Sequence, residues 1–404
     1  MKKNNKILLV FWKNNKLLNK IFRVFGKNNI KLVGGAVRCA LRKKYTNDLD
    51  LAVNKSPEQV KRILKKNNIN FFDKSKGHGT VSIVFNDYNI EITSLREDIE
   101  TYGRSAKVIF TNSFEIDSMR RDFTINAIFS DFDGNLYDPQ NGIDDLSKNT
   151  IKFIGDAEKR ISEDFLRILR YFRMLSSYSY SNKHLDEKSL KAAIKCFHKI
   201  RNLSKERILN EFQKLILSDN ANFSLSLMKK NKLLDYLIKD LQKVKTQYLM
   251  KIIDLPNNFI LRIAYLILVS DLKLDEIKKN LKISNSVFFQ LKNISANKTL
   301  ITSEIQAKKI KYFYGKEVTL TNYKLLNFIN NKKNKKYILK IINNWEAPKF
   351  PLSGKDIIKY KSIKGKDIGS LLKCIEEWWI DKNFIPNKKE CIKQIEISFL
   401  GPRG

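Results

Sequence analysis

The sequence predicts an α+β domain followed by a long all-helical extension. In the first third of the chain, short segments that alternate polar and apolar residues are interleaved with helical patterns, and such alternation is typical of half-buried strands. From about Ile161, glycine becomes rare and apolar residues recur at i, i+3 and i+4 almost to the end of the chain. This spacing indicates amphipathic helices. A chain of 404 residues has room for two to four domains.

The first predicted element is a helix over Lys16–Phe25, which we expect to pack against the α+β domain. The basic, acid-poor start of the chain would also suit a transit peptide, whereas the apolar run Ile7–Trp12 is too short for the core of a signal peptide. Ser56 is the expected N-cap of a helix over Pro57–Lys66, because proline is favoured at the first helical position. The other predicted elements of this domain are a strand over Ile30–Val33, a helix from Ala36, and strands over Asp48–Val53, Thr80–Phe85, Ile90–Thr93 and Lys107–Thr111.

The chain is strongly basic. It has 77 Lys and Arg residues against 42 Asp and Glu residues, for a formal net charge of +35. This charge favours a polyanionic partner, nucleic acid or an acidic membrane surface, although abundant Lys, Asn and Ile would also follow from an AT-rich coding sequence. No apolar run approaches the length of a membrane span, which argues against a membrane protein. The four cysteines show no C-x-x-C spacing, so they predict neither a zinc site nor a disulfide framework and fit a reducing, bacterial-type cytoplasm.

Two aspartates on one predicted strand are the first candidates for chemistry. Asp48 and Asp50 stand at i and i+2, so their side chains project from one face of the strand, with backbones about 6–7 Å apart. Mg²⁺ prefers hard oxygen ligands and commonly keeps substrate phosphates in its remaining positions. The pair therefore predicts a Mg²⁺ site, although D-x-D on a surface strand is common. Glu91, among apolar neighbours on another predicted strand, is a candidate third carboxylate; otherwise it faces outward from an edge strand.

A candidate phosphate-binding turn lies upstream of the aspartates. Residues 32–38 read as a strand, two glycines and the start of a helix that carries an arginine. Gly34 and Gly35 would let backbone N–H groups approach an anion, and Arg38 adds a cation able to grip phosphate oxygens. The alternative is that the two glycines form an ordinary turn.

A pair of arginines, Arg120 and Arg121, precedes Asp122 and an amphipathic segment. One of these arginines is a candidate contact for a triphosphate or a base. Asp122 otherwise caps a helix and pairs with an arginine.

A second arginine-rich segment predicts base recognition. We expect Asp164 and Arg167, at i and i+3, to lie on one helix, where they are neighbours on one face. The aspartate would accept from the exocyclic amino group of C or A, which U lacks, and the arginine would donate to the adjacent ring acceptor. The alternative is an intrahelical ion pair. Arg170 and Arg173 continue at threes, a spacing that drifts around a helix, so some of these arginines are expected to meet phosphates instead.

These motifs resemble, in order and spacing, those of the class II tRNA nucleotidyltransferases. This family comprises CCA-adding enzymes and bacterial poly(A) polymerases of the polymerase-β-like superfamily. The matching motifs, which together are highly specific, are GGAVR at 34–38, DLD at 48–50, EITSLR at 91–96, GR at 103–104, RRDFTINA at 120–127, DPQNGIDDL at 138–146, EDFLRILRYFR at 163–173, LSKERILNEF at 203–212 and FPLSGKDI with GKDIGSLL within 350–372.

The resemblance implies a polymerase-β-like nucleotidyltransferase head, with a mixed sheet and helices, followed by an all-helical neck, body and tail. The expected limits are an N-terminal helical segment at 1–28, the head at 29–150, the neck at 151–215, the body at 216–300 and the tail at 301–404. Asp48 and Asp50 match the metal ligands and Glu91 matches the third catalytic carboxylate, while Gly103 and Arg104 fall in the flexible loop associated with switching from C to A addition. The expected nucleotide contacts are Gly34, Gly35, Arg38, Arg120, Arg121, Asp164, Arg167, Arg170 and Arg173.

The activity implied by the resemblance is addition of C, C and A to the 3′ end of tRNA from CTP and ATP. In this mechanism the tRNA 3′ hydroxyl attacks the α-phosphate in line and releases pyrophosphate, while the carboxylates hold two Mg²⁺ ions. One departure concerns Cys39, which stands where the family usually has an acid, so the support of Arg38 is an open question.

Three alternatives remain open at the level of sequence. A poly(A) polymerase of this family typically carries G-R-R-F where this chain reads GHGTVS at 77–82. An enzyme that adds only CC or only A would need a partner. An RNA-binding protein without catalysis is disfavoured by the intact carboxylates.

Overall fold

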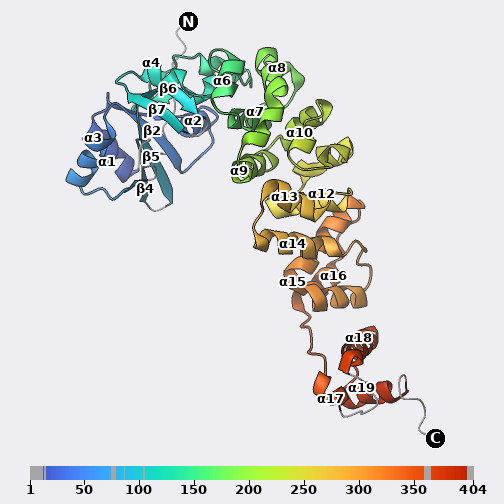
Figure 1. Ribbon diagram of the computed structural model, residues 1–404. Coiled ribbons are helices and arrows are strands. Elements are labelled where there is room, and N and C mark those ends of the chain that lie inside the picture. The colour runs from blue at the N-terminus through green and yellow to red at the C-terminus, as the bar shows by residue number, and fades with distance from the viewer. Residues whose placement is uncertain are drawn as a thin grey trace. The chain divides into compact units, whose positions relative to one another are not determined.

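The computed structural model describes Trp12 and residues 15–73, 79–85, 87–102, 105–358 and 365–397. The chain divides into two compact units, both drawn in Figure 1. The first is formed by Met1–Arg262 with Asp275–Ile283, and the second by Ile263–Leu274 with Ser284–Gly404. The predicted limits of head, neck, body and tail stay predictions. In the described part of the chain, no helix combines the length and the apolar character needed to cross a membrane.

The first unit contains a mixed sheet, in which Figure 1 labels β2, β4 and β5. Its strand order is β3-β4-β5-β2-β1-β8-β9. In this sheet β2 and β5 are parallel neighbours, whereas the other neighbouring pairs are antiparallel. A separate antiparallel hairpin is formed by β6 and β7. The strands are β1 (Ile30–Val33), β2 (Asp48–Val53), β3 (Phe72–Asp73), β4 (Thr80–Phe85), β5 (Tyr88–Ser94), β6 (Arg96–Tyr102), β7 (Ser105–Phe110), β8 (Phe129–Ser130) and β9 (Leu136–Tyr137).

The predicted strands are confirmed, with β1, β2 and β4 at the expected limits and with β5 and β7 differing at their ends. Four strands were not predicted. The strands β3, β8 and β9 have two residues each and are defined by their neighbours in the sheet rather than by their own pattern. The sequence of β6, REDIETY, is rich in charge because this strand pairs only with β7 and lies outside the main sheet.

Helix α1 (Lys16–Phe25) forms at the predicted residues and packs on the first unit. The side chain of Asn15 caps it by accepting a hydrogen bond from the backbone N–H of Leu18 at 3.0 Å. The Phe22 side chain is 1% exposed, and its ring centre lies 5.2 Å from that of Phe132.

The prediction for α3 (Pro57–Lys66) is also confirmed, because Ser56 and Gln59 form a reciprocal capping box. The other α-helices of the first unit, apart from those at its border, are α2 (Gly35–Leu41), α4 (Phe114–Met119), α5 (Gly142–Ser147), α6 (Ala157–Glu163), α7 (Leu166–Tyr178), α8 (Glu187–Cys196), α9 (Lys205–Ile216), α10 (Ala221–Lys230) and α11 (Thr246–Met250).

Among the described residues beyond Ile161, only helices and loops occur, as the apolar spacing predicts. Short 3₁₀ helices are interspersed, namely η1 (Thr124–Asn126), η2 (Asn182–His184), η3 (Phe197–Asn202), η4 (Leu234–Tyr236), η5 (Leu241–Lys243) and η6 (Lys251–Asp254). The helices at the border and in the second unit are α12 (Phe259–Leu268), α13 (Leu274–Leu281), α14 (Asn285–Ala296), α15 (Glu304–Ile329), α16 (Lys336–Asn344), α17 (Gly354–Ile358), α18 (Gly365–Asp381) and α19 (Lys388–Ile395). Helix α15 is interrupted at Gly315, where φ is 78°.

A close backbone approach between α5 and η1 fixes the segment that carries the paired arginines. A Cβ atom added at Gly142 would lie 2.2 Å from the carbonyl oxygen of Thr124, so only glycine fits there. The Thr124 hydroxyl also donates to Asp145 at 2.8 Å. Asp138 completes the turn by accepting from the backbone N–H groups of Gly142 and Ile143, each at 2.8 Å.

We expect Gly142→Ala to destabilise the protein by about 1–3 kcal/mol or more, because the added methyl group meets rigid backbone. Gly369→Ala is the matched control, since its Cβ would have no neighbour within 4 Å. Alanine is favoured over glycine within a helix, so this control should be neutral or slightly stabilising. Urea unfolding of both variants measures the difference, and equal stabilities would contradict the close approach.

Candidate active site

Asp48 and Asp50 lie on the exposed face of β2, as their spacing predicts. Leu49 and Leu51 alternate with them and are each 1% exposed, so the strand directs apolar side chains into the core and carboxylates outward. Gly34 follows the neighbouring strand β1 with φ of +69°, and a Cβ there would be 3.5 Å from an Asp50 carboxylate oxygen. This glycine brings the turn close to the carboxylates in a conformation that other residues rarely adopt.

Glu91 lies on β5 opposite Asp50, in parallel register. Loss of hydration raises the pKa of the Asp50 carboxyl above its ordinary value, and the Glu91 carboxylate raises it further. Such a concentration of hard, negative oxygen ligands fits a divalent cation. No group of three His, Cys, Asp or Glu side chains arranged to hold a metal ion is found in the described ranges.

Arg38 is held by two side chains from distant parts of the first unit. Its Nε donates to the Tyr178 hydroxyl at 3.0 Å, and its Nη1 donates to Oδ1 of Asn126. The Tyr178 ring centre lies 5.6 Å from the guanidinium carbon. Burial raises the pKa of the Cys39 thiol, so this residue is neutral and does not replace the usual acid. Tyr178 and Asn126 thus support Arg38 without a carboxylate at position 39.

Arg120 and Arg121 share one buried carboxylate. Asp117 is 1% exposed and lies 2.7 Å from Nη2 of Arg120 and 2.8 Å from Nη2 of Arg121. Burial alone would raise the pKa of Asp117, but the two guanidinium groups, Arg121 foremost, hold it below its usual value. Arg121 also lies over the Phe129 ring, 5.3 Å from its centre. Both arginines are therefore fixed before any substrate arrives.

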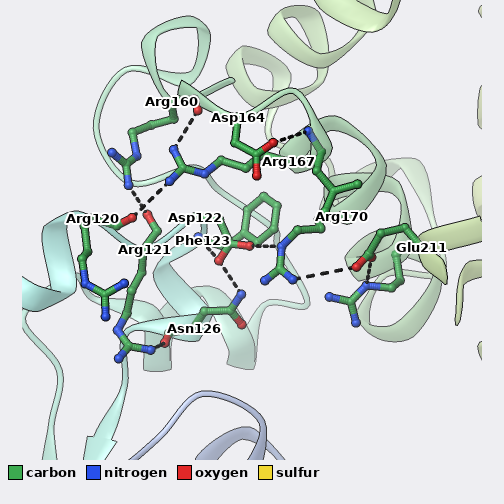
Figure 2. A network of polar contacts seen from close by, with 12 residues as sticks. Arg120, Arg121, Asp122, Phe123, Asn126, Arg160, Asp164, Arg167, Arg170 and Glu211 are labelled. Atoms are coloured by element: carbon green, nitrogen blue, oxygen red, sulfur yellow. Dashed lines mark hydrogen bonds and ion pairs between the residues drawn. The ribbon is translucent and has the colours of Figure 1, made fainter. Parts of the chain in front are cut away.

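An ion pair between buried Asp122 and half-buried Arg170 joins α7 to the segment before η1, as Figure 2 shows. Arg170 Nε donates to Asp122 at 2.6 Å, and the other carboxylate oxygen of Asp122 accepts from the Asn126 amide at 2.6 Å. Burial alone would raise the pKa of Asp122, yet the Arg170 guanidinium holds it well below its usual range. The sequence-based alternative of a helix cap is wrong for Asp122. Phe123 is the N-cap of η1, and that helix has no side-chain cap bond.

The prediction that Asp164 and Arg167 lie on one helix is wrong. Helix α7 begins at Leu166, and Asp164 has an extended backbone in the break after α6. One Asp164 oxygen accepts from the Leu166 backbone N–H at 3.0 Å, and such local bonds draw aspartate out of helix interiors. The other oxygen accepts from Arg207 of α9 at 2.7 Å. The ion-pair partner of Asp164 is therefore Arg207 rather than Arg167.

Arg167 and Arg160 bind the backbone of the paired arginines (Figure 2). Arg167 donates to the Arg120 carbonyl oxygen at 3.2 Å, and Arg160 donates to the Arg121 carbonyl oxygen at 2.7 Å. Arg160 and Arg167 also share the Glu163 carboxylate. These contacts tie α6 and α7 to the segment that contains the paired arginines.

Arg173 pairs with Glu211 of α9 at 2.6 Å, and Glu211 is 6% exposed. The nearest carboxylates of Arg167, Arg170 and Arg173 are those of Glu163, Asp122 and Glu211, as their drift around α7 predicts, and Arg170 also reaches Glu211 at 3.9 Å.

These side chains line a cavity of about 720 Å³. The predicted site residues in its wall are Gly34, Gly35, Arg38, Asp48, Asp50, Arg120, Arg121, Asp164, Arg167, Arg170 and Arg173. Glu91 does not line it. The predicted flexible loop at Gly103 and Arg104 lies outside the described residues.

Sequence reasoning missed several residues of the cavity wall. These are Arg96, Asp98, Asn126, Glu163 and Arg207. The motifs at 91–96, 120–127, 163–173 and 203–212 carried the signal for four of them, because they contain Arg96, Asn126, Glu163 and Arg207. Asp98 lies outside the motifs and pairs with Arg96 along β6 at 3.3 Å, which only recognition of that strand would reveal.

The cavity combines carboxylates that suit a cation with guanidinium groups that suit phosphate oxygens and base edges. Its volume is in the range typical of pockets for nucleotide-sized ligands, about 300–1,000 Å³. The arrangement can hold a nucleoside triphosphate and direct charge at a transferring phosphoryl group.

Two family models match the chain. The model described as the poly A polymerase head domain matches residues 30–152, and the model described as a probable RNA and SrmB-binding site of polymerase A matches residues 184–244. The mitochondrial CCA tRNA nucleotidyltransferase 1 of Homo sapiens is 30% identical, covering 94% of this chain and 89% of that protein. The CCA-adding enzyme of Staphylococcus epidermidis is 31% identical, covering 95% of this chain and 91% of that protein. The chain belongs to the class II CCA-adding enzyme family.

A solved structure of a CCA-adding enzyme agrees with this fold. The crystal structure of the Bacillus stearothermophilus CCA-adding enzyme in complex with CTP superimposes with a TM-score of 0.78 at 23% identity, covering 95% of this chain and 98% of that one. The α+β head and helical remainder expected from the sequence are thus confirmed as the fold of the CCA-adding enzyme family.

We expect Asp122→Asn to destabilise the protein by about 1–3 kcal/mol at pH 7, because it removes the charged partner of the Arg170 Nε–H. Arg170 keeps Glu211 at 3.9 Å, and its side chain is 33% exposed, which limits the loss. The pKa of Asp122 is lower in the folded than in the unfolded state. Its contribution is therefore complete above the unfolded value of about 3.9 and is lost as the pH falls below it. Urea unfolding of wild type and variant should show a stability difference that is full at pH 7 and shrinks below about pH 4.

Asp133→Asn is the control for this prediction, because Asp133 pairs with Lys27 at the surface, at 3.2 Å with side chains 52% and 59% exposed. Its effect should stay below about 1 kcal/mol. A stability of Asp122→Asn equal to that of the control at pH 7 would contradict the role of the Asp122–Arg170 pair.

Proposed function

We propose that this chain completes the 3′ end of tRNA by adding C, C and A from CTP and ATP, without a nucleic-acid template. The observation that carries the proposal is that Asp48 and Asp50 line the same cavity as arginines from α7. Membership of the class II CCA-adding enzyme family supports the same reaction. We expect the activity in a bacterial-type cytoplasm, consistent with dispersed free cysteines.

In the proposed reaction, Asp48 and Asp50 hold Mg²⁺, which when bound would supply Lewis acidity and neutralise phosphate charge. The positively charged Arg38 and Arg121 bind triphosphate oxygens. Tyr178 and Asn126 already fix Arg38, and Asp117 already fixes Arg121. Prior fixation reduces the entropy lost when the substrate binds. The bound triphosphate is thereby oriented for in-line attack by the tRNA 3′ hydroxyl, with pyrophosphate as the leaving group.

Base choice is proposed to depend on Asp164 and Arg167. Asp164 is locked by the Leu166 N–H and by Arg207, so its remaining acceptor positions point in defined directions. A carboxylate oxygen in this place accepts from the amino group of C or A, whereas U presents the O4 carbonyl at that position, which cannot donate. Arg167 is fixed by two backbone carbonyl oxygens and by Glu163. Its remaining N–H donors bind the ring acceptor next to the amino group of C or A.

The strongly basic helical remainder is proposed to contact tRNA by shape and phosphate rather than by base sequence, as readers of double-stranded RNA do. Binding of this kind releases counterions, so affinity should fall steeply with salt.

The proposal is tested by incubating the full chain with Mg²⁺ and a tRNA transcript that lacks its terminal CCA, then sequencing the 3′ ends. With CTP and ATP together, we expect ends that finish in CCA. Ends that stop at CC, or A added only after CC, would indicate half of the activity and a missing partner. Long adenosine tails would favour a poly(A) polymerase, the function that the family models name.

In the same assay, Asp48→Ala should abolish incorporation, because the cation loses one of its two ligands on β2. The control is Asp87→Ala, which removes an exposed carboxylate from the turn between β4 and β5. Binding of tRNA, measured by filter retention, should be retained in both variants and shows that they are folded. Normal incorporation by Asp48→Ala would refute the assignment.

Asp164→Ala should reduce the preference for CTP and ATP over UTP by about 10- to 100-fold, the discrimination typical of one well-placed base contact. The measurement is the ratio of kcat/KM values for each nucleotide. The matched control is Glu158→Ala, because Glu158 lies on α6 and pairs with Lys195 at the surface, at 2.7 Å. Unchanged preference in Asp164→Ala would count against base selection by this residue.

A further inference from the structure

A second, smaller cavity adjoins the catalytic one in the first unit. Its volume is about 140 Å³. Arg38 and Cys39 line both cavities, so these two residues form a wall that the cavities share. The other lining residues come from the end of α2 and its loop, from the end of α7 and from the segment after α9, and they are Arg42, Lys44, Ser177, Tyr178, Ser218 and Asp219.

The walls of the second cavity are predominantly cationic. Arg38, Arg42 and Lys44 contribute positive charge, and Asp219 contributes the one carboxylate among its described lining residues. Lys44 and Asp219 pair at 3.0 Å, with side chains 61% and 71% exposed. A pair this exposed is weak and can rearrange when an anion arrives.

Arg42 is fixed in the wall before any ligand binds. Its guanidinium carbon lies 4.7 Å from the Tyr178 ring centre, and its Nη2 donates to the Asn149 side chain. A guanidinium has five N–H groups, and the bond to Asn149 occupies one of them. Because Tyr178 also contacts Arg38, one aromatic ring holds both arginines of the cavity.

The size of the cavity limits its ligand. A volume of about 140 Å³ corresponds to roughly four or five waters, at about 30 Å³ each. This space accepts a phosphate group, whereas pockets for whole nucleotide-sized ligands measure about 300–1,000 Å³. The charge and the volume together favour a single phosphate group.

We propose that the second cavity, through Arg42, Lys44 and Arg38, binds a backbone phosphate of the RNA whose 3′ end occupies the catalytic cavity. The inference rests on the proposed function. The larger cavity has room for the nucleoside triphosphate, so the phosphate that reaches its smaller neighbour belongs to the strand that is being extended. Arg38 borders both cavities, so it can position the RNA strand relative to the incoming nucleotide.

The experiment compares Lys44→Ala and Arg42→Gln with Lys27→Ala in the full chain. Lys27 is the matched control, because it forms a similarly exposed pair with Asp133 on the same unit. Lys44→Ala alters only an exposed side chain and keeps the test valid if Arg42→Gln, which loses the stack on Tyr178, folds poorly. The Kd of a tRNA transcript lacking CCA is measured by filter binding across a salt series, and KM for CTP is measured separately.

We expect Lys44→Ala and Arg42→Gln to weaken tRNA binding about three- to tenfold and to reduce the slope of log Kd against log salt by about one. KM for CTP should change little, and Lys27→Ala should behave as wild type. Unchanged tRNA affinity and salt slope in both cavity variants would overturn the proposal. A raised KM for CTP or weaker inhibition by pyrophosphate, with tRNA affinity unchanged, would also overturn it and assign the cavity to nucleotide phosphates.

The result of this tRNA-binding experiment can be separated from the result of the nucleotide-addition assay. If the wild-type chain adds neither C nor A, the proposed reaction fails, while the binding measurements still report on the phosphate site. If wild type completes CCA and the cavity variants bind tRNA normally, only the second cavity is refuted.

Discussion

The ion pair of Asp122 and Arg170 is the interaction on which the candidate site depends. Asp122 lies in the segment that follows the paired arginines, and Arg170 lies on α7, so the pair connects two regions that are far apart in sequence. The same carboxylate binds Asn126, and Asn126 in turn binds Arg38. A chain of polar contacts therefore runs from α7 to the turn beside the aspartates of β2. In a low-dielectric interior each member of such a chain depends on the others, because an unpaired charge there is costly.

The site tolerates a high density of arginine because buried acids partly neutralise it. Asp117 holds two guanidinium groups, and Glu211 holds another. These acids are nearly inaccessible to water, so they do not themselves meet a ligand, yet they offset the mutual repulsion of the cations. The cations that line the cavity still outnumber its carboxylates, and this excess is available to an anionic substrate.

The elements and local patterns were largely predictable, whereas the partners of individual side chains were not. The alternation along β2 predicted the shared face of Asp48 and Asp50, and Ser56 with Pro57 predicted the start of α3, because both features depend on neighbours in sequence. The i, i+3 spacing misled at Asp164, since a backbone break that is stabilised by the aspartate itself removes it from the helix. Its true partner, Arg207, follows from the packing of α9 against α7, which no local pattern encodes.

The bonds from Arg160 and Arg167 to backbone carbonyls have a consequence for handling the protein. The acceptors are neutral carbonyl oxygens, and the two guanidinium groups are largely shielded from solvent ions. Dissolved salt should therefore weaken these hydrogen bonds very little. Contacts between surface lysines and a polyanion weaken as the salt concentration rises, because the release of counterions drives them. Concentrated salt should thus strip adhering nucleic acid from the protein during purification while the catalytic cavity keeps its shape.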